Sequence, residues 1–444
     1  MEQIVYDNIL MVAYLLLWVL TFAWYQHKGH AVDAGSAIIL SYVGYAFFSI
    51  LTYNEPIEIL VTYIYDPLRL FPFIYLYIML MIALLPIIYH HIHPVKKIDS
   101  PHSRIFKILG LLSICCAVVL IPSIIGNFRE GLVMLFLDND AGKDAYEEQL
   151  KGAQDSGSAI HNLPAIVYNT LFEISVFTSF YYLSLKKKTV YFTLPLMLSL
   201  LVGLLMPIMK GQRGVVIINF LTIIAGYMLF RRFLSKRINK TVNYMGVIAI
   251  IVLSLPIAAI TLSRYQGKKT AVSDYINWYI GQGNLYFNNH GLDAGGIRYG
   301  DRTFNLFKRL VDKDTPKNYV ERRDKYHNLD LDDNLFSTFV GDFTIDFGPY
   351  VAVVIFVLFN FWVLKQIRAR GDTIRLHQLL LLFFTVCICM QGGMTLFSFA
   401  DTGNLRIIAF ALLYFYLRYH DVLLKRYPLH ICNAYDKEDI QTTL

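Results

Sequence analysis

Charged residues are scarce in this chain: of 444 residues, only 16% are Asp, Glu, Lys or Arg, whereas 56% are hydrophobic. Soluble domains carry about 25% charged residues, so this composition, with its mean hydropathy of +0.46, excludes an ordinary soluble protein. One helical membrane span needs about 20 apolar residues, and the chain holds enough of them for about eleven spans. The sequence therefore predicts a multi-pass membrane protein.

Several chemical motifs are also missing. No phosphate-binding loop of the GxxxxGK[ST] type occurs, which argues against an ATP-driven pump. His90, His91 and His93 are clustered but have no cysteine or carboxylate at a useful sequence spacing, so no metal site is expected. The five cysteines fall in predicted spans or in the C-terminal tail, so no disulfide braces the segments outside the membrane. We expect neither a metal nor another cofactor.

Continuous apolar runs of 16 to 23 residues recur along the chain, and such runs indicate helices rather than the alternating strands of a barrel. The runs cover residues 8–25, 37–53, 70–89, 108–125, 163–185, 189–209, 214–230, 242–262, 347–364, 379–397 and 402–417. The predicted fold is an all-α, multi-pass membrane protein with about eleven transmembrane helices.

The basic residues predict the orientation. If the N-terminus is outside, the cytoplasmic segments hold 21 Lys and Arg, whereas the short outer segments hold seven. Positive residues gather on the cytoplasmic side of membrane proteins. The first ten residues contain no Lys or Arg and so lack the basic start of a signal peptide. We expect an external N-terminus and a cytoplasmic C-terminus.

This orientation defines four regions. Residues 1–262 hold eight spans and a smaller outer loop at 126–162, residues 263–346 form one large outer loop, residues 347–418 hold three spans, and residues 419–444 form a cytoplasmic tail. From Arg264 to Asp346 the large loop has twelve Lys and Arg and as many Asp and Glu. A nucleic-acid surface is strongly basic, so a nucleic-acid partner is not expected.

The few charges within or beside the spans are candidate site residues. Glu173 lies near the middle of a span, where a charged side chain costs about 2.5–3.5 kcal/mol on insertion scales. Four cations are expected at the outer ends of spans: Lys210 and Arg213, in a hairpin that also contains Gln212, then Arg264 and Arg406. Such cations either reach toward lipid headgroups or bind a lipid pyrophosphate, to which arginine donates paired hydrogen bonds.

This arrangement resembles the Wzy-type polymerases of O-antigen and capsular oligosaccharide repeat units. The shared features are the number of spans, the basic Gly211-Gln212-Arg213-Gly214 hairpin that opens a span, Arg264-Tyr265 at the end of another, and a long outer loop that ends in Asp346-Phe347-Gly348. The resemblance in the order of spans and loops covers most of the chain, whereas the shared sequence motifs are short.

The resemblance implies a lipid-donor glycosyltransferase of GT-C-like architecture in the bacterial inner membrane. Such an enzyme transfers a growing glycan from undecaprenyl pyrophosphate to the next lipid-linked repeat unit on the periplasmic face, and a chain-length regulator and a flippase are its expected partners. Arg213 and Arg264, supported by Arg406 and Lys210, would stabilise the charge that develops on the departing pyrophosphate. Glu173 and Gln212 would support these cations.

The reaction also needs a base for the acceptor hydroxyl. The candidates are His290 and the carboxylates Asp342 and Asp346, whose spacing of four residues places them on one face of a helix. An ordinary loop histidine is the favoured alternative for His290. Asp346 can instead cap the following span, because carboxylates suit helix N-termini.

Two other functions fit the same features. An O-antigen ligase would use the same donor with a lipid A core as acceptor. A flippase or secondary transporter would use Glu173 as a proton or substrate site. The outer loop of about 80 residues argues against transport, which does not require it.

Overall fold

The computed structural model describes residues 2–29, 32–55, 65, 67–100, 104–126, 159–185, 190–210, 212–265, 272–317, 319–332, 335–368, 371–396, 400–423 and 430–433. Most of the predicted smaller loop at 126–162 and most of the predicted tail at 419–444 lie outside these ranges. The chain divides into two compact units. The first unit consists of residues 1–93, 268–367 and 384–408, and the second of residues 94–267, 368–383 and 409–444.

Each of the eleven predicted apolar runs coincides largely with one helix. These helices are α1 (Glu2–Gly29), α2 (Ala34–Tyr53), α4 (Leu70–Ile92), α5 (Arg104–Gly126), α8 (Ala159–Ser184), α9 (Val190–Met209), α10 (Arg213–Phe230), α11 (Lys236–Tyr265), α16 (Pro349–Ile367), α17 (Leu376–Gly392) and α18 (Ala400–Leu423). Within the described ranges, the first nine of them contain a stretch long and apolar enough to cross a membrane. The helical, multi-pass character is thereby confirmed. The count of eleven spans stays a prediction, because α17 has only 17 residues and α18 carries Asp401, Arg406 and Arg418.

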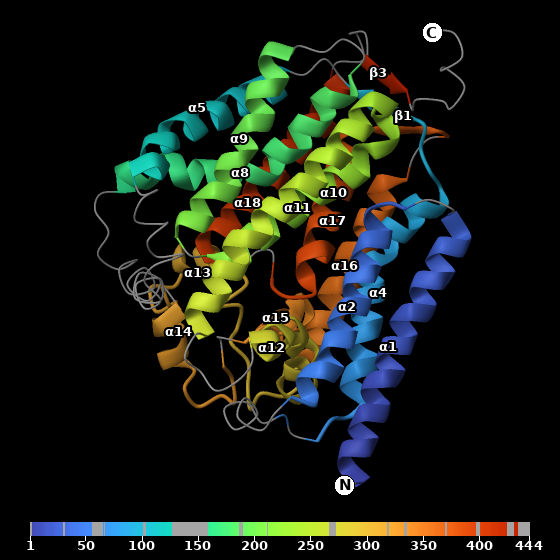
Figure 1. The fold of residues 1–444 in the computed structure, drawn as a ribbon, viewed down its shortest axis with the longest axis vertical. Coiled ribbons are helices and arrows are strands. Elements are labelled where there is room, and N and C mark those ends of the chain that lie inside the picture. Colours follow the sequence, from blue (N-terminus) through green and yellow to red (C-terminus); the bar gives the residue numbers. More distant parts are fainter. Residues whose placement is uncertain are drawn as a thin grey trace. The chain divides into compact units, whose positions relative to one another are not determined.

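In the first unit, α1, α2 and α4 pack against one another, and α16 packs on α4 (Figure 1). A further helix, α12 (Val272–Tyr286), lies within the predicted outer loop and packs along α2. Gly281 makes this close approach possible, because a Cβ at this position would lie 2.3 Å from the backbone oxygen of Phe48. Ser49 and Thr52 of α2 donate hydrogen bonds to the backbone oxygens of Gly281 and Asn277, each at 2.8 Å.

The chain between α12 and α16 is largely structured and is called the interhelical segment (residues 287–348) below. It contains the π-helical turn η2 (Phe287–Gly291) and the helices α13 (Asn305–Arg309), α14 (Tyr319–Lys325) and α15 (Thr338–Phe347). Gly348, with φ +81°, ends α15 in a conformation that favours glycine, and Pro349 then starts α16, where a missing N–H costs nothing. The expected span from Phe347 therefore begins two residues later.

The ends of α2 and α4 meet at a buried polar contact. Asp33 caps α2 by accepting a hydrogen bond from the backbone N–H of Ser36. The other carboxylate oxygen lies 2.7 Å from Nδ1 of His91, whose ring is buried and stacked on Tyr25. Sequence spacing did not indicate a carboxylate beside this histidine, because the two residues are 58 positions apart.

In the second unit, α8 packs against α5, α9 and α10. This unit also contains a small sheet of β1 (Lys97–Ser100), β2 (Thr373–Arg375) and β3 (His430–Asn433), in the order β2-β1-β3. Strand β1 runs parallel to β2 and antiparallel to β3. The all-α expectation missed this sheet because strands of three or four residues are too short to carry a recognisable alternation.

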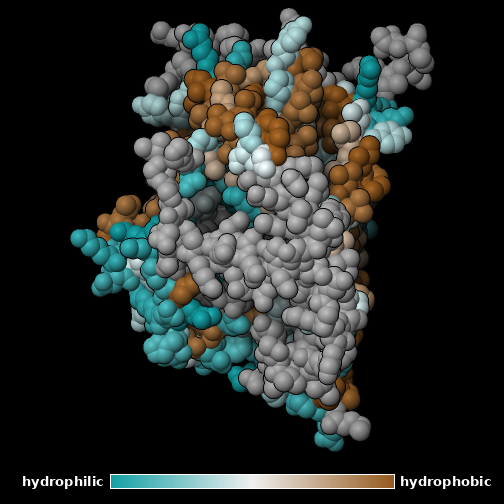
Figure 2. Space-filling model, turned by 60° about the vertical axis from the view of Figure 1, so that its left-hand side comes forward, coloured by the Kyte–Doolittle hydropathy of each residue, from teal (hydrophilic) through white to brown (hydrophobic). Residues whose placement is uncertain are grey.

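Hydrophobic side chains cover much of the helix surfaces, as Figure 2 shows in brown for one face. On α11, Ile251 and Leu255 are 60% and 66% exposed, and on α16 Leu358 is 66% exposed. Water would disfavour so much apolar surface on a soluble protein. Lipid hydrocarbon accommodates it, in agreement with the helix lengths.

Candidate functional site

Two arginines and two carboxylates form a buried cluster in the interhelical segment. Helix α15 places Asp342 and Asp346 one turn apart on the same face, as their spacing predicts. Arg298 is 1% exposed, and its Nε donates to Oδ1 of Asp346 at 2.8 Å while its Nη2 lies 3.6 Å from Oδ1 of Asp342. Arg302 approaches the same oxygen of Asp342 with its Nε at 3.0 Å. We call these four residues the arginine–aspartate cluster.

Further polar contacts complete the surroundings of the carboxylates. The backbone N–H and the hydroxyl of Thr303 donate to Oδ2 of Asp346 at 2.7 and 2.6 Å. The hydroxyl of Ser337 donates to Asp342 at 3.1 Å. The side chain of Asp346 therefore binds Arg298 and Thr303. It does not cap α16, which was the alternative role. The arginine and hydroxyl contacts hold both carboxylates in place, which favours a structural role over that of a base for both aspartates.

Local backbone geometry aims the two arginines at α15. The backbone N–H of Arg298 donates to the carbonyl of Ile345, and a tight turn follows in which Tyr299 has φ +52° and Gly300 φ +80°. Thr338, at the start of α15, has φ +64°, which is strained for a β-branched side chain. Strain of this kind persists only where the surrounding contacts hold the backbone firmly, so the cluster lies in a rigid part of the segment.

Asp301 forms a second ionic group beside the cluster. Its fully buried carboxylate contacts the ammonium groups of Lys308 and Lys325 and accepts a hydrogen bond from the Tyr326 hydroxyl at 2.7 Å. Burial alone would raise the pKa of Asp301, but the hydrogen bonds from the two lysines and the tyrosine outweigh it and lower the pKa below its ordinary value. Asp301 is thus a charged anchor between α13 and α14.

Helix α18 is tied to the same region. The side chain of Asn404, which is fully buried, donates to the carbonyl of Thr303 at 2.7 Å and accepts from the backbone N–H of Leu306 at 3.0 Å. Arg309 forms an ion pair with Asp401. Arg406 lies two residues after Asn404 and is half-buried. It belongs to the first unit, as the cluster does.

His290 lies in the π-helical turn η2, a rare element that recurs at functional sites. Its Nδ1 is 3.3 Å from Oδ2 of Asp330, and its side chain is 19% exposed. When Nδ1 donates a proton to the carboxylate, Nε2 is left as the basic nitrogen. Asn288, two residues earlier in the turn, exchanges two hydrogen bonds with the backbone of Arg69, at 2.9 and 2.8 Å, and so fixes the turn. His290 is therefore better suited to accept a proton than either aspartate.

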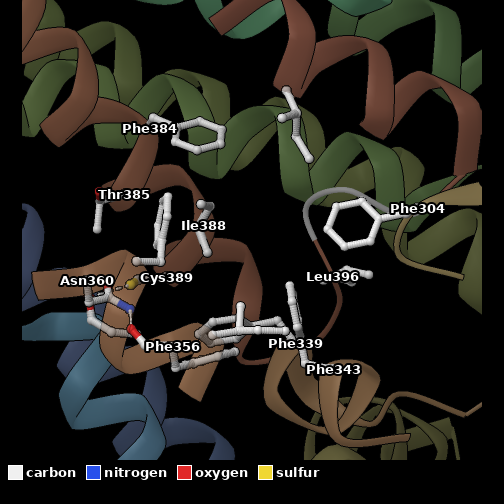
Figure 3. Close-up of a pocket in the computed structure, with 14 residues that line it drawn as sticks. Phe304, Phe339, Phe343, Phe356, Asn360, Phe384, Thr385, Ile388, Cys389 and Leu396 are labelled. Atoms are coloured by element: carbon white, nitrogen blue, oxygen red, sulfur yellow. Dashed lines mark hydrogen bonds between the residues drawn. The ribbon is translucent and has the colours of Figure 1, made fainter. Parts of the chain in front are cut away.

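An apolar cavity of about 230 Å³ lies beside the cluster, within the first unit (Figure 3). Phe339 and Phe343 line it from α15, the helix that carries both aspartates, and Phe304 lines it from the position after Thr303. Phenylalanine, isoleucine and cysteine side chains of α16 and α17 form most of the remaining wall. The arginine–aspartate cluster thus adjoins a hydrocarbon-lined space.

The remaining predicted site residues belong to the second unit. Lys210 is exposed in the turn after α9, Gln212 precedes α10 and is half-buried, and Glu173 is fully buried in α8. Arg213 starts α10 and Arg264 lies in the last turn of α11, but the placement of their side chains is outside the described part of the chain. The expected convergence of the four cations involves both units and stays a prediction.

Sequence reasoning missed Arg298, Arg302 and Asp301 as individually important residues. A signal was available, because Arg298 and Arg302 are four residues apart, as are Asp342 and Asp346. Two pairs of opposite charge with equal spacing are complementary if both segments place their side chains one turn apart. The separation of at least 40 positions between the pairs hid this relationship.

No family model, curated protein or solved structure matches this chain.

Proposed function

We propose that the protein polymerises undecaprenyl-pyrophosphate-linked oligosaccharide repeat units on the outer face of a bacterial inner membrane. The pairing of His290 with Asp330 supports this proposal most: Nδ1 of His290 faces the Asp330 carboxylate. The turn that carries His290 is hydrogen-bonded to the start of α4. A paired imidazole at the end of apolar helices suits proton abstraction from a hydroxyl beside a membrane. The resemblance to the Wzy-type polymerases supplies the substrate.

In the proposed reaction, an acceptor sugar hydroxyl attacks the anomeric carbon of the lipid-linked donor. A carbon–oxygen bond forms as the bond to pyrophosphate breaks, Nε2 of His290 takes the hydroxyl proton, and undecaprenyl pyrophosphate leaves with the electron pair. Arg213, Arg264, Arg406 and Lys210 are proposed to stabilise its developing charge. Asp342 and Asp346 hold Arg298 and Arg302 in place and so keep the interhelical segment rigid.

The direct test uses purified protein and chemically defined lipid-linked repeat units, without nucleotide or added metal. We expect a ladder of products spaced by one repeat unit. The absence of a ladder with folded protein and a native substrate would contradict the proposal. Transfer to a lipid A core would then indicate a ligase, and translocation of the lipid across reconstituted vesicles would indicate a flippase.

A variant test addresses the pyrophosphate contacts. Arg213→Ala is expected to abolish chain elongation without loss of protein from the membrane, because a fixed cation at the leaving group is removed. Arg237→Ala, which removes an exposed arginine near the start of α11, is the control and should leave chain length unchanged. Chains of normal length from Arg213→Ala would remove Arg213 from the mechanism.

A further inference from the structure

We propose that the apolar cavity between α15, α16 and α17 holds a segment of the hydrocarbon chain of the lipid-linked substrate. This inference rests on the proposed function, since it assigns a place to the lipid part of that substrate. It requires only contacts within the first unit.

The lining of the cavity selects an apolar occupant. Phe304, Phe339, Phe343, Phe356, Phe359 and Phe384 contribute six aromatic rings to the wall. Two polar side chains of the wall are turned to backbone groups: the amide of Asn360 donates to the carbonyl of Phe356 at 2.9 Å, and the Cys389 thiol contacts the carbonyl of Ala83 at 3.5 Å (Figure 3). A smaller apolar cavity of about 150 Å³ in another protein stays dry and binds benzene. Water is therefore a poor occupant here, and hydrocarbon is a good one.

The depth of the cavity matches the position of a lipid chain. Its residues on α16 are Ile355, Phe356, Phe359 and Asn360, which lie six to eleven positions after the first residue of the helix, or about 9–17 Å along its axis. Ile355, Phe359, Phe384 and Ile388 are half-buried, so part of the wall lies close to the surface of the helices. A helix of this length and hydropathy places these residues in the hydrocarbon region.

The neighbouring cluster argues for the chain of the substrate rather than that of a bulk lipid. Phe339 and Phe343 share α15 with Asp342 and Asp346, and Phe304 follows the threonine that binds Asp346. The bilayer is as apolar as the cavity, so moving a lipid chain from the bilayer into the cavity gives little binding free energy. The cavity instead positions a chain whose reacting end lies at the interhelical segment, which carries His290. Stacking of Phe339 on Phe356, with ring centroids 5.3 Å apart, keeps that wall of the cavity fixed.

A matched pair of variants on α16 tests this assignment. Ile355 lines the cavity, whereas Leu358 is 66% exposed and does not line it. Ile355→Trp and Leu358→Trp add the same atoms, but only the first fills the cavity. The probe is undecaprenyl pyrophosphate with a benzophenone near the end of the chain, crosslinked to the protein in phospholipid nanodiscs, with labelled peptides identified by mass spectrometry.

We expect labelling on α16 and α17 that excess unlabelled undecaprenyl pyrophosphate suppresses, and a severalfold lower yield for Ile355→Trp with no change for Leu358→Trp. Labelling that phosphatidylglycerol suppresses equally well, or that is unaffected by Ile355→Trp, would overturn the proposal. If Ile355→Trp does not fold, Ile388→Phe on α17 fills the same space with a smaller change. The probe carries no sugar and the assay needs no turnover, so a failure of polymerase activity leaves this result interpretable.

Discussion

Arg298 is almost completely buried, and its Nε donates a hydrogen bond to Oδ1 of Asp346 at 2.8 Å. The two residues are 48 positions apart in the chain, and their contact joins the turn at Tyr299 to α15. Breaking a buried ion pair by removing one partner leaves an uncompensated charge. This contact therefore determines whether the interhelical segment holds its shape.

Arg298→Ala is expected to destabilise the protein by about 3–5 kcal/mol, because it leaves two buried carboxylates without their shared cation. Thermal unfolding in detergent measures the effect as a lower midpoint. Arg323→Ala, which removes an exposed arginine of α14, should not move the midpoint. In the double variant Arg298→Ala/Asp346→Asn, the loss of stability should be smaller than the sum of the losses in Arg298→Ala and Asp346→Asn. Simple additivity would contradict a direct pair.

Gly281→Ala tests the close packing of α12 on α2. Alanine favours a helix over glycine by about 1 kcal/mol, yet its Cβ would lie 2.3 Å from the carbonyl oxygen of Phe48. We expect a lower unfolding midpoint. Gly246→Ala in α11 is the matched control, because a Cβ there meets no atom within 4 Å. The packing argument is wrong if both variants shift the midpoint upward.

Acid should weaken the Asp301 anchor. The pKa of Asp301 is lowered in the folded state, so the folded protein releases this proton more readily than the unfolded chain. Its contribution to stability is therefore complete above the unfolded pKa of about 3.9 and is lost as the pH falls through the folded value. Unfolding midpoints measured from pH 7 downward should fall less steeply below pH 4 in Asp301→Asn than in the unchanged protein.

Asp301→Asn should also be less stable at pH 7, because Lys308 and Lys325 lose their shared anion. Asp324→Asn, which alters an exposed carboxylate, is the control and should retain the full acid dependence. An identical pH profile for Asp301→Asn and the unchanged protein would show that this aspartate does not anchor the segment.

His290→Ala is expected to lower the initial rate of chain elongation by about 10²–10⁴-fold, the usual contribution of a general base. Asp330→Asn should lower the rate less, because it removes only the group that orients the imidazole. His327→Ala, at an exposed histidine of the same segment, should retain the rate. A His290→Ala protein with a normal unfolding midpoint and a normal rate would exclude His290 as the base.

The sequence by itself determined the long apolar helices and their positions. Long apolar runs such as residues 214–230 form helices because lipid offers no hydrogen-bond partner to backbone groups. Each run must therefore satisfy its backbone hydrogen bonds within itself, and a helix does so. The spacing of Asp342 and Asp346 likewise sufficed to place them on one helical face, because that spacing is a property of the helix itself.

Only the tertiary structure decided what those faces contact. Arg298 reaches Asp346, and Asp33 reaches His91, through folding of chain segments 48 and 58 residues apart, which no local pattern records. The cavity likewise forms where side chains of several helices fail to fill the space between them. Hydrophobic periodicity identifies the apolar faces but not the partner of each face, because burial is non-directional and ion pairing depends on the final geometry.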